Sequence, residues 1–229
     1  MYELILIDAD ETLFDFVKAE KIALKITLES FGFAGDFLQA HELYKVINKA
    51  LWKDLEKGLI NNEELRLERF KRLLENLQLD YSPFEFSEQY ALNLGNCSFL
   101  LEGALEVCIA LHKKYKVLIV TNGMKDIQHS RIDNSLIKNY IDGVVISEEV
   151  GFAKPDTRIF DCALKMAKHE DKRTVLMVGD ALSSDIKGAI DYGVDSCWLN
   201  TKKVVNESEL KPSYVIDIIT DLLKIVSVE

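Results

Sequence analysis

The chain has 229 residues, of which 48% are hydrophobic and 29% are charged, and its formal net charge is −10. This length can bury a substantial apolar core without disulfides or structural metals. The negative charge argues against a nucleic-acid polymer as partner, because binding one requires clustered Lys and Arg to neutralise phosphates. A small phosphate ester is still allowed, since a divalent cation and one or two lysines can reverse the sign of a single pocket.

The cysteines and the N-terminal residues indicate the cellular compartment in which the protein is expected. The four cysteines include no C-x-x-C pair, so the spacing of a zinc site is absent. The first residues are acidic where a signal peptide needs a basic start, and no apolar stretch approaches the roughly 20 residues of a membrane-spanning helix. We therefore expect a cytoplasmic protein with reduced, buried thiols and no membrane partner.

Short apolar segments that end at polar residues recur along the chain. Six strands are predicted in this way, at residues 2–7, 117–120, 144–146, 175–178, 197–199 and 214–216. Helical patterns separate most of these segments. This alternation is the signature of an α/β fold with a doubly wound, parallel, Rossmann-like sheet.

The strand signal disappears between about residues 16 and 98, and the apolar positions between Leu43 and Leu51 follow helical spacing. The string Ser82-Pro83-Phe84-Glu85 marks a helix start, with a capping hydroxyl, a proline at the first helical position and a glutamate three residues after the cap. We predict an inserted all-helical domain of about four helices at residues 16–98. Residues 1–15 and 99–229 would together form the core domain.

Polar side chains follow several of the predicted strands. These candidate site residues are Asp8, Asp10, Thr121, Asn122, Lys154, Asp180 and Asp185. Open α/β sheets bind ligands at the carboxyl ends of their strands, so we expect these residues to gather at one edge.

Several carboxylates at one edge of a sheet repel one another unless they share a proton or bind a cation. Asp8 and Asp10 are two residues apart, and Asp180 and Asp185 add negative charge at the same edge. A hard divalent cation with oxygen ligands resolves this repulsion, and Mg²⁺ is the natural candidate.

Phosphoryl transfer accounts for the remaining candidates, because its transition state spreads negative charge over oxygens that cations and hydrogen-bond donors can stabilise. Lys154 supplies the charge, while the Thr121 hydroxyl and nearby backbone N–H groups supply hydrogen bonds. Asn122 is counted with these two as phosphate-binding. A carboxylate can itself take the phosphoryl group, giving an aspartyl phosphate that water later hydrolyses.

The strings DADETL, VTNG, AKP and GD, followed by Asp185, resemble in this order the four motifs of the haloacid dehalogenase superfamily. The resemblance covers essentially the whole chain. It implies that Asp8 is the nucleophile, that Asp10 is the general acid and base, and that Thr121 and Lys154 bind phosphate. It also implies a Mg²⁺ held by Asp8, Asp180, Asp185 and the backbone carbonyl of Asp10. The helical insert resembles the cap domain of that family.

The acidic residue Asp10 favours a phosphate hydrolase or a phosphomutase within that family. Glu11 stands where most members have glycine, and with the strings ISEEVGFAKPD and DSCWLN it resembles the pyrimidine 5′-nucleotidase branch. We therefore expect a Mg²⁺-dependent phosphatase of nucleoside 5′-monophosphates. The alternatives are a sugar-phosphate or phosphoglycolate phosphatase, a phosphomutase, and a non-enzymatic regulatory domain phosphorylated on Asp8.

Several of these residues also have a purely structural interpretation. Asn122-Gly123 is typical of a turn with positive φ, and Asp185 could complement a helix dipole. Arg131 is most simply a salt-bridge or helix-end partner, and Trp52 most simply an interhelical aromatic residue. The role of Glu11 is open.

Overall fold

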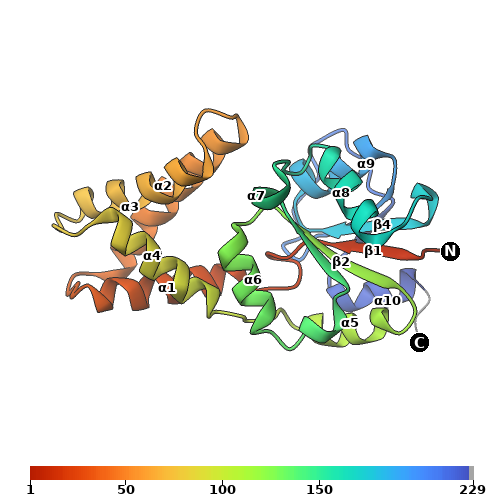
Figure 1. The fold of residues 1–229 in the computed structure, drawn as a ribbon, viewed down its shortest axis with the longest axis horizontal. Coiled ribbons are helices and arrows are strands. Elements are labelled where there is room, and N and C mark those ends of the chain that lie inside the picture. Colours follow the sequence, from red (N-terminus) through yellow and green to blue (C-terminus); the bar gives the residue numbers. More distant parts are fainter. Residues whose placement is uncertain (227–229) are drawn as a thin grey trace. The chain divides into compact units, whose positions relative to one another are not determined.

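The computed structural model describes residues 1–226, and the chain divides into two compact units. The first unit contains Met1–Phe16 together with the chain from Ser98 onwards, and the second is Val17–Cys97. Figure 1 shows the fold and labels most of its helices and some of its strands. Within residues 1–226, none of the helices combines the length and the apolar character needed to span a membrane.

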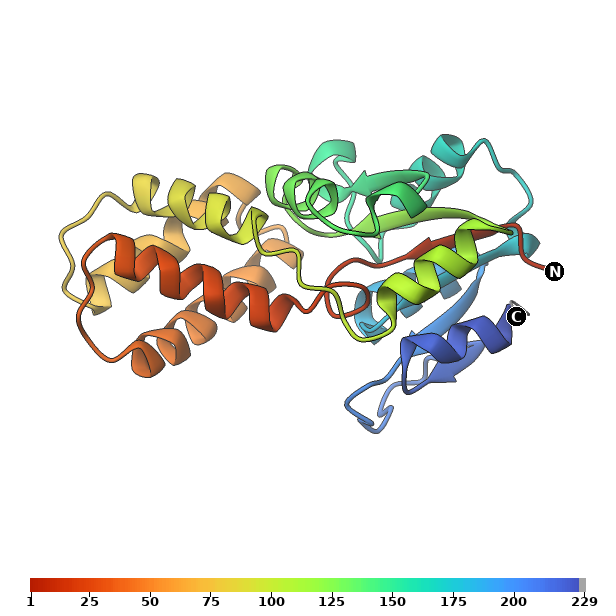
Figure 2. The ribbon, with the colours of Figure 1, turned by 90° about the horizontal axis from the view of Figure 1, so that it is seen from below.

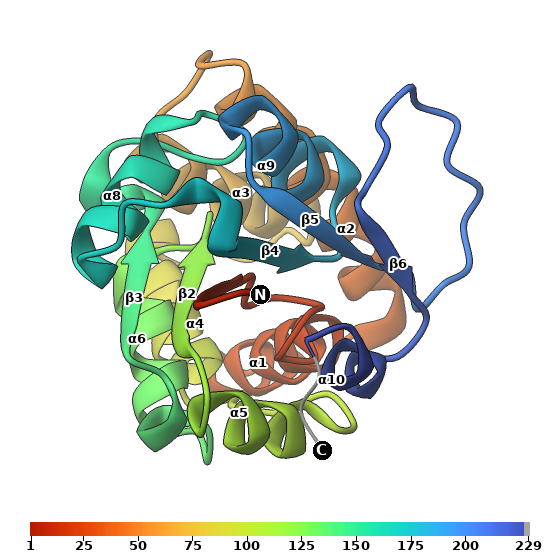
Figure 3. The same ribbon diagram turned by 90° about the vertical axis from the view of Figure 1, so that its right-hand side faces the viewer.

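The first unit is built on a sheet in which all neighbouring strands are parallel. Among the described residues its strands are β1 (Leu4–Ile7), β2 (Lys116–Thr121), β3 (Gly143–Ile146), β4 (Val175–Gly179), β5 (Asp195–Leu199) and β6 (Tyr214–Ile216). They lie in the order β3-β2-β1-β4-β5-β6 (Figure 3). The predicted doubly wound parallel sheet is confirmed. Because β1 lies between β2 and β4, the residues that follow these three strands meet at the centre of one edge.

Helices cover both faces of this sheet (Figure 3). They are α5 (Ala104–His112), α6 (Lys125–Asp133), α7 (Ser147–Val150), α8 (Arg158–Ala167), α9 (Lys187–Tyr192) and α10 (Leu222–Ile225). Short 3-10 turns lie at η1 (Lys138–Tyr140), η2 (Lys172–Thr174) and η4 (Ile219–Asp221), and a π-helical turn, η3 (Leu182–Ile186), follows β4.

The core of the first unit has two layers because alternate residues of each strand point to opposite faces. In β1, Leu6 belongs to the same buried cluster as Phe160 of α8. Its neighbour Ile7 belongs to the opposite cluster, which contains Val107 of α5. All four residues of β1 are buried, which explains why this strand is a continuous apolar run in the sequence.

The second unit is filled by helices, which Figure 2 shows in red to yellow. They are α1 (Phe16–Ser30), α2 (Phe37–Glu56), α3 (Asn62–Asn76) and α4 (Pro83–Gly95). The predicted helix start in α4 is confirmed, since the Ser82 hydroxyl accepts a hydrogen bond from Glu85 N at 3.3 Å and Pro83 is the first helical residue. The all-helical character of the insert is likewise confirmed.

A cluster of aromatic side chains lies in the interior of the second unit. The rings of Phe70 and Tyr90 lie 4.9 Å apart between centroids, and the Arg69 guanidinium lies 4.7 Å from the Phe70 centroid. The buried Tyr44 hydroxyl donates a hydrogen bond to Tyr90 Oη at 3.0 Å, and burial raises the pKa of Tyr44 to about 12. These hydroxyls therefore remain neutral hydrogen-bonding groups inside this unit.

Replacement of Leu6 by Ala should destabilise the first unit, because Leu6 is fully buried at the centre of the sheet and Ala would leave a cavity there. We expect a loss of about 3 kcal/mol in the free energy of unfolding, measured by urea denaturation. The matched control is Leu136→Ala, since Leu136 is 72% exposed and its truncation should cost less than about 0.5 kcal/mol. Equal losses in the two variants would contradict this description of the core.

Candidate active site

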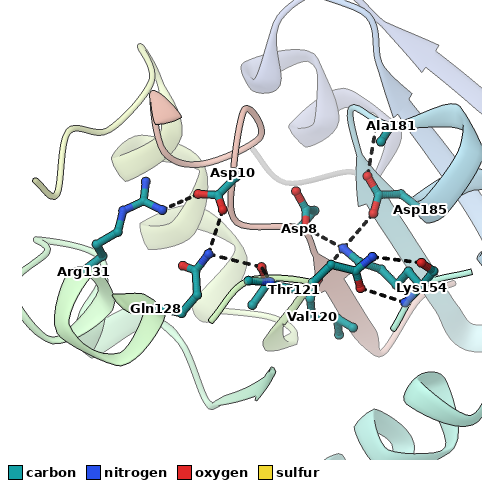
Figure 4. Close-up of polar contacts among 11 residues, drawn as sticks. Asp8, Asp10, Val120, Thr121, Gln128, Arg131, Lys154, Ala181 and Asp185 are labelled. Carbon is teal, nitrogen blue, oxygen red and sulfur yellow. Dashed lines mark hydrogen bonds and ion pairs between the residues drawn. The ribbon is translucent and has the colours of Figure 1, made fainter. Parts of the chain in front are cut away.

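The turn after β1 carries Asp8 and Asp10. Asp8 N donates to Val178 O at 2.9 Å, so the pairing between β1 and β4 continues into the first site residue. The chain then reverses through Glu11, whose φ of 59° lies in the left-handed region, and Glu11 N donates to Phe14 O at 2.8 Å. The Asp8 side chain is buried, whereas the Asp10 carboxylate points toward α6 (Figure 4).

Lys154 is a buried cation at this edge of the sheet, beside Asp8 (Figure 4). Its Nζ forms an ion pair with Asp8 Oδ1, lies 2.7 Å from Asp185 Oδ1, and donates to Val120 O at 2.6 Å. The ammonium group thus links the ends of β1 and β2 to the turn after β4.

The Asn122 side chain holds the main chain of Lys154. Asn122 Nδ2 donates to Lys154 O at 2.9 Å, and Asn122 Oδ1 accepts from Lys154 N at 2.7 Å. Both polar atoms of the amide are therefore used to place Lys154, and the phosphate-binding role of the Asn122 side chain stays a prediction. The buried Thr121 hydroxyl oxygen accepts from Gly123 N at 3.2 Å, so its proton can be donated to a ligand.

Asp8, Asp180 and Asp185 form a group in which one carboxylate oxygen from each lies within 4.8 Å of the others. Trp198 Nε1 donates to the carbonyl of Asp180 at 2.8 Å and fixes the backbone at that position. Three carboxylate oxygens suit a hard divalent cation such as Mg²⁺, so the donor set fits the predicted metal. The Asp10 carboxylate is not part of this group. The predicted contribution of Asp10 to metal binding is that of its backbone carbonyl.

The pKa shifts in this group reflect burial and mutual repulsion. Burial raises the pKa of Asp8 well above its usual value, and the adjacent Lys154 opposes that rise. Burial, Asp185 and Glu11 raise the pKa of Asp180 to about 7. Burial would lower the pKa of Lys154, but Asp185 and Asp8 raise it, so this side chain is a fixed cation. One ammonium among three carboxylates leaves negative charge that a divalent cation would neutralise.

Glu11 adds a fourth carboxylate near this group. Its Oε2 lies 3.6 Å from Lys202 Nζ, and its charge is one of the causes of the raised pKa of Asp180. A non-glycine residue in the left-handed region costs about 1–2 kcal/mol. The chain thus tolerates backbone strain at Glu11.

Two further residues, Gln128 and Arg131 of α6, contact Asp10, although neither is among the site residues expected from the sequence. Gln128 Nε2 donates to Asp10 Oδ2 at 2.7 Å, and Arg131 Nη1 forms an ion pair with Asp10 Oδ1 (Figure 4). Arg131 is therefore a salt-bridge partner, as its simplest interpretation states, but its partner is the predicted general acid and base. One feature of the sequence could have pointed to these two residues. They are three positions apart, so they lie on the same face of a helix, and that helix follows the strand that ends at Thr121.

Gly123 has a different role from the one that its sequence context suggests. Its backbone is outside the positive-φ region, so the alternative structural interpretation, a turn with positive φ, does not apply at this position. A Cβ atom at this position would lie 2.3 Å from Gln128 Nε2. Glycine is needed here because it leaves room for the Gln128 side chain to reach Asp10.

The chain matches the family described as haloacid dehalogenase-like hydrolase over residues 2–193. It belongs to this family of hydrolases, and the resemblance stated from its motifs is confirmed. It is similar to the pyrimidine 5′-nucleotidase YjjG of Escherichia coli (strain K12), with 34% identity over 221 residues that make up 96% of each chain. The pyrimidine 5′-nucleotidase PynA of Streptococcus pneumoniae (strain ATCC BAA-255 / R6) is 34% identical over 224 residues, 97% of this chain and 94% of that relative.

Among solved structures, the chain is similar to the HAD-hydrolase YfnB of Bacillus subtilis bound to magnesium. The identity is 29%, the TM-score is 0.91, and the match covers 99% of both chains. The family match and the nucleotidase relatives confirm the expected enzyme class, a phosphoric monoester hydrolase.

Replacement of Gly179 by Ala should weaken metal binding. A Cβ atom at Gly179 would lie 2.2 Å from Asp185 Oδ2 and 2.6 Å from Asp185 Cβ, so the Asp185 carboxylate must move. Loss of a partner that merely orients a ligand reduces metal affinity by about 10- to 100-fold, so displacement of Asp185, a predicted ligand, should cost at least as much. Titration calorimetry with Mg²⁺ on the protein without substrate measures this loss.

The matched control for this prediction is Gly143→Ala, where the added Cβ would meet mainly the flexible Met166 side chain, 2.7 Å from Sδ. This variant should bind Mg²⁺ as the wild type does. Unchanged Mg²⁺ affinity in Gly179→Ala would remove Asp185 from the predicted metal site.

Proposed function

We propose that this protein is a Mg²⁺-dependent phosphatase that hydrolyses nucleoside 5′-monophosphates, with pyrimidine nucleotides preferred. One observation carries the proposal: Asp8 is a buried carboxylate paired with Lys154 at the edge where Asp180 and Asp185 meet. A carboxylate fixed beside a cation and a metal-binding group is the arrangement that nucleophilic attack on a phosphate requires.

In the first half of the reaction, an Asp8 carboxylate oxygen attacks the phosphorus atom. A bond forms between that oxygen and phosphorus while the bond between phosphorus and the ester oxygen breaks. Asp10 gives its proton to the departing oxygen, so the leaving group departs as a neutral alcohol. Lys154 and the Thr121 hydroxyl stabilise the negative charge on the phosphoryl oxygens.

In the second half, water attacks the phosphorus atom of the aspartyl phosphate. Asp10 accepts the proton of that water, the bond between phosphorus and Asp8 breaks, and inorganic phosphate leaves. Both carboxyl groups return to their starting states. Asp10 therefore acts first as an acid and then as a base.

The residues that would hold Mg²⁺ are Asp8, Asp180 and Asp185, together with the carbonyl of Asp10. The bound cation would offset the negative charge of the carboxylates and of the substrate phosphate. The mutual approach of the three carboxylate oxygens supports this proposal.

We assign catalysis to the first unit, which contains all seven predicted site residues. The second unit, residues 17–97, is proposed to act as a cap that limits water and selects the leaving group. We also propose that the reaction takes place in the cytoplasm, in keeping with four free cysteines. A nucleotide substrate is supported by the two pyrimidine 5′-nucleotidase relatives.

Replacement of Asp8 by Asn should reduce kcat by at least about 10⁴-fold, because the amide cannot accept a phosphoryl group. The measurement is release of inorganic phosphate at saturating substrate. The control is Asp133→Asn, since the Asp133 side chain is 60% exposed and pairs with Lys138 on the surface. Full activity in Asp8→Asn would exclude Asp8 as nucleophile.

A panel of phosphate monoesters should show the substrate preference. We expect kcat/KM for dUMP, dTMP and UMP to exceed that for sugar phosphates and phosphoglycolate by at least about 10-fold, as different contacts to the leaving group allow. The panel is run with Mg²⁺ and repeated in excess chelator, which should abolish turnover.

If sugar phosphates or phosphoglycolate are turned over as well as nucleotides or better, the nucleotide proposal is wrong. The protein would then be a sugar-phosphate or phosphoglycolate phosphatase. Isomerised product without net release of phosphate would indicate a phosphomutase. A phosphoaspartate that lasts many minutes without turnover would indicate a regulatory domain. Full activity in chelator would contradict the metal requirement.

A further inference from the structure

The two oxygens of the Asp10 carboxylate are held by different kinds of donor from α6 (Figure 4). Oδ1 faces the Arg131 guanidinium, whose side chain is 0% exposed, while the Asp10 side chain is 27% exposed. Oδ2 accepts a hydrogen bond from the neutral Gln128 amide at 2.7 Å. One oxygen is thus bound by a buried charge and the other by a weaker, neutral donor.

Arg131 is itself fixed by aromatic rings. Its guanidinium carbon lies 4.7 Å from the centroid of Phe14 and 5.5 Å from that of Phe16. Phe14 belongs to the same turn as Asp10, with which it forms an isolated β-bridge. The turn after β1 therefore contacts Arg131 through both a carboxylate and an aromatic face, and this leaves the guanidinium little freedom.

Gln128 connects Asp10 to the phosphate-binding end of β2. Its Nε2 also lies 3.4 Å from Thr121 Oγ1, at the limit of a hydrogen bond. Gly123, which has no Cβ, allows this approach. The amide therefore places the Asp10 carboxylate relative to a hydroxyl that is proposed to bind the phosphate.

We infer that Gln128 and Arg131 are positioning residues for proton transfer by Asp10. Arg131 anchors Oδ1, and Gln128 sets the direction of Oδ2, the oxygen that carries the proton to the leaving group and accepts it from water. The inference rests on the proposed function, because Gln128 and Arg131 have this role only in a reaction that uses Asp10 as acid and base.

Replacement of Gln128 by Met tests this inference, because Met keeps the length of the side chain and removes the donor. The loss should depend on the leaving group. With an alkyl phosphate such as a nucleotide or glycerol phosphate, kcat should fall by about 10- to 100-fold with less than about a 3-fold change in KM. With 4-nitrophenyl phosphate, whose leaving group departs without a proton, the release of nitrophenolate in the first turnover, measured by stopped flow, should slow by less than about 3-fold.

A double-mutant cycle with Asp10→Asn separates positioning from general structural damage. If Gln128 acts through Asp10, Gln128→Met should lower kcat by less than about 2-fold further in the Asp10→Asn background. Arg131→Lys provides a second variant, since it keeps a cation but lacks the planar fork of arginine. Its kcat should fall for an alkyl phosphate and change little for 4-nitrophenyl phosphate. This variant replaces Gln128→Met in the test if Gln128→Met does not fold.

The matched control is Asn134→Ala at the end of α6, where the exposed Asn134 Nδ2 donates to Ser130 Oγ at 3.4 Å. This variant removes an amide donor from the surface of the same unit, away from Asp10, and should leave both rates unchanged. Circular dichroism and thermal melting establish that each variant is folded.

The inference is overturned if folded Gln128→Met has the kinetics of the wild type, if it slows both substrates equally, or if its effect adds in full to that of Asp10→Asn. Failure of the proposed function looks different, because the wild type would then hydrolyse no phosphate monoester. A preference for a phosphate other than a nucleotide leaves the test intact, since any alkyl phosphate that is turned over can be used.

Discussion

Negative charge at the centre of the sheet is the constraint on which the rest of the site depends. Asp8, Asp180 and Asp185 bring three carboxylates together at the ends of β1 and β4, and the Lys154 ammonium group contacts two of them, Asp8 and Asp185. Their neighbours hold this arrangement in place: the Asn122 amide fixes the main chain of Lys154, and Gly179 leaves the space that Asp185 occupies. Burial makes this charge costly, and a bound divalent cation would offset it.

The two aspartates after β1 differ in their surroundings rather than in their chemistry. Asp8 is buried beside an ammonium group and two carboxylates, whereas Asp10 is partly exposed and is held by an amide and a guanidinium from α6. Different environments can give two neighbouring carboxyl groups different tasks. This contrast supports the proposed division between a nucleophile and a proton-transfer residue.

Each of the two units has its own buried core. The first has apolar clusters on both faces of its sheet, and the second has aromatic rings around Arg69 among buried aliphatic side chains such as Leu24 and Leu73. Because the cores are separate, the surface of the second unit can change while the packing of the first is kept. The proposed substrate therefore rests on the relatives and not on the fold.

The sequence by itself determined the class of fold and the order of the site residues. Buried parallel strands are continuous apolar runs, and the residues that follow them must meet at one edge, so the positions of Asp8, Thr121 and Asp180 could be predicted. Only the tertiary structure decided the partners of Asp10. Gln128 and Arg131 are 118 and 121 residues away from it in the chain, and the packing of α6 against the turn after β1 brings them together. A polar residue on a helix carries no sign of such a partner, because the distance between the two is set by the fold and not by local spacing.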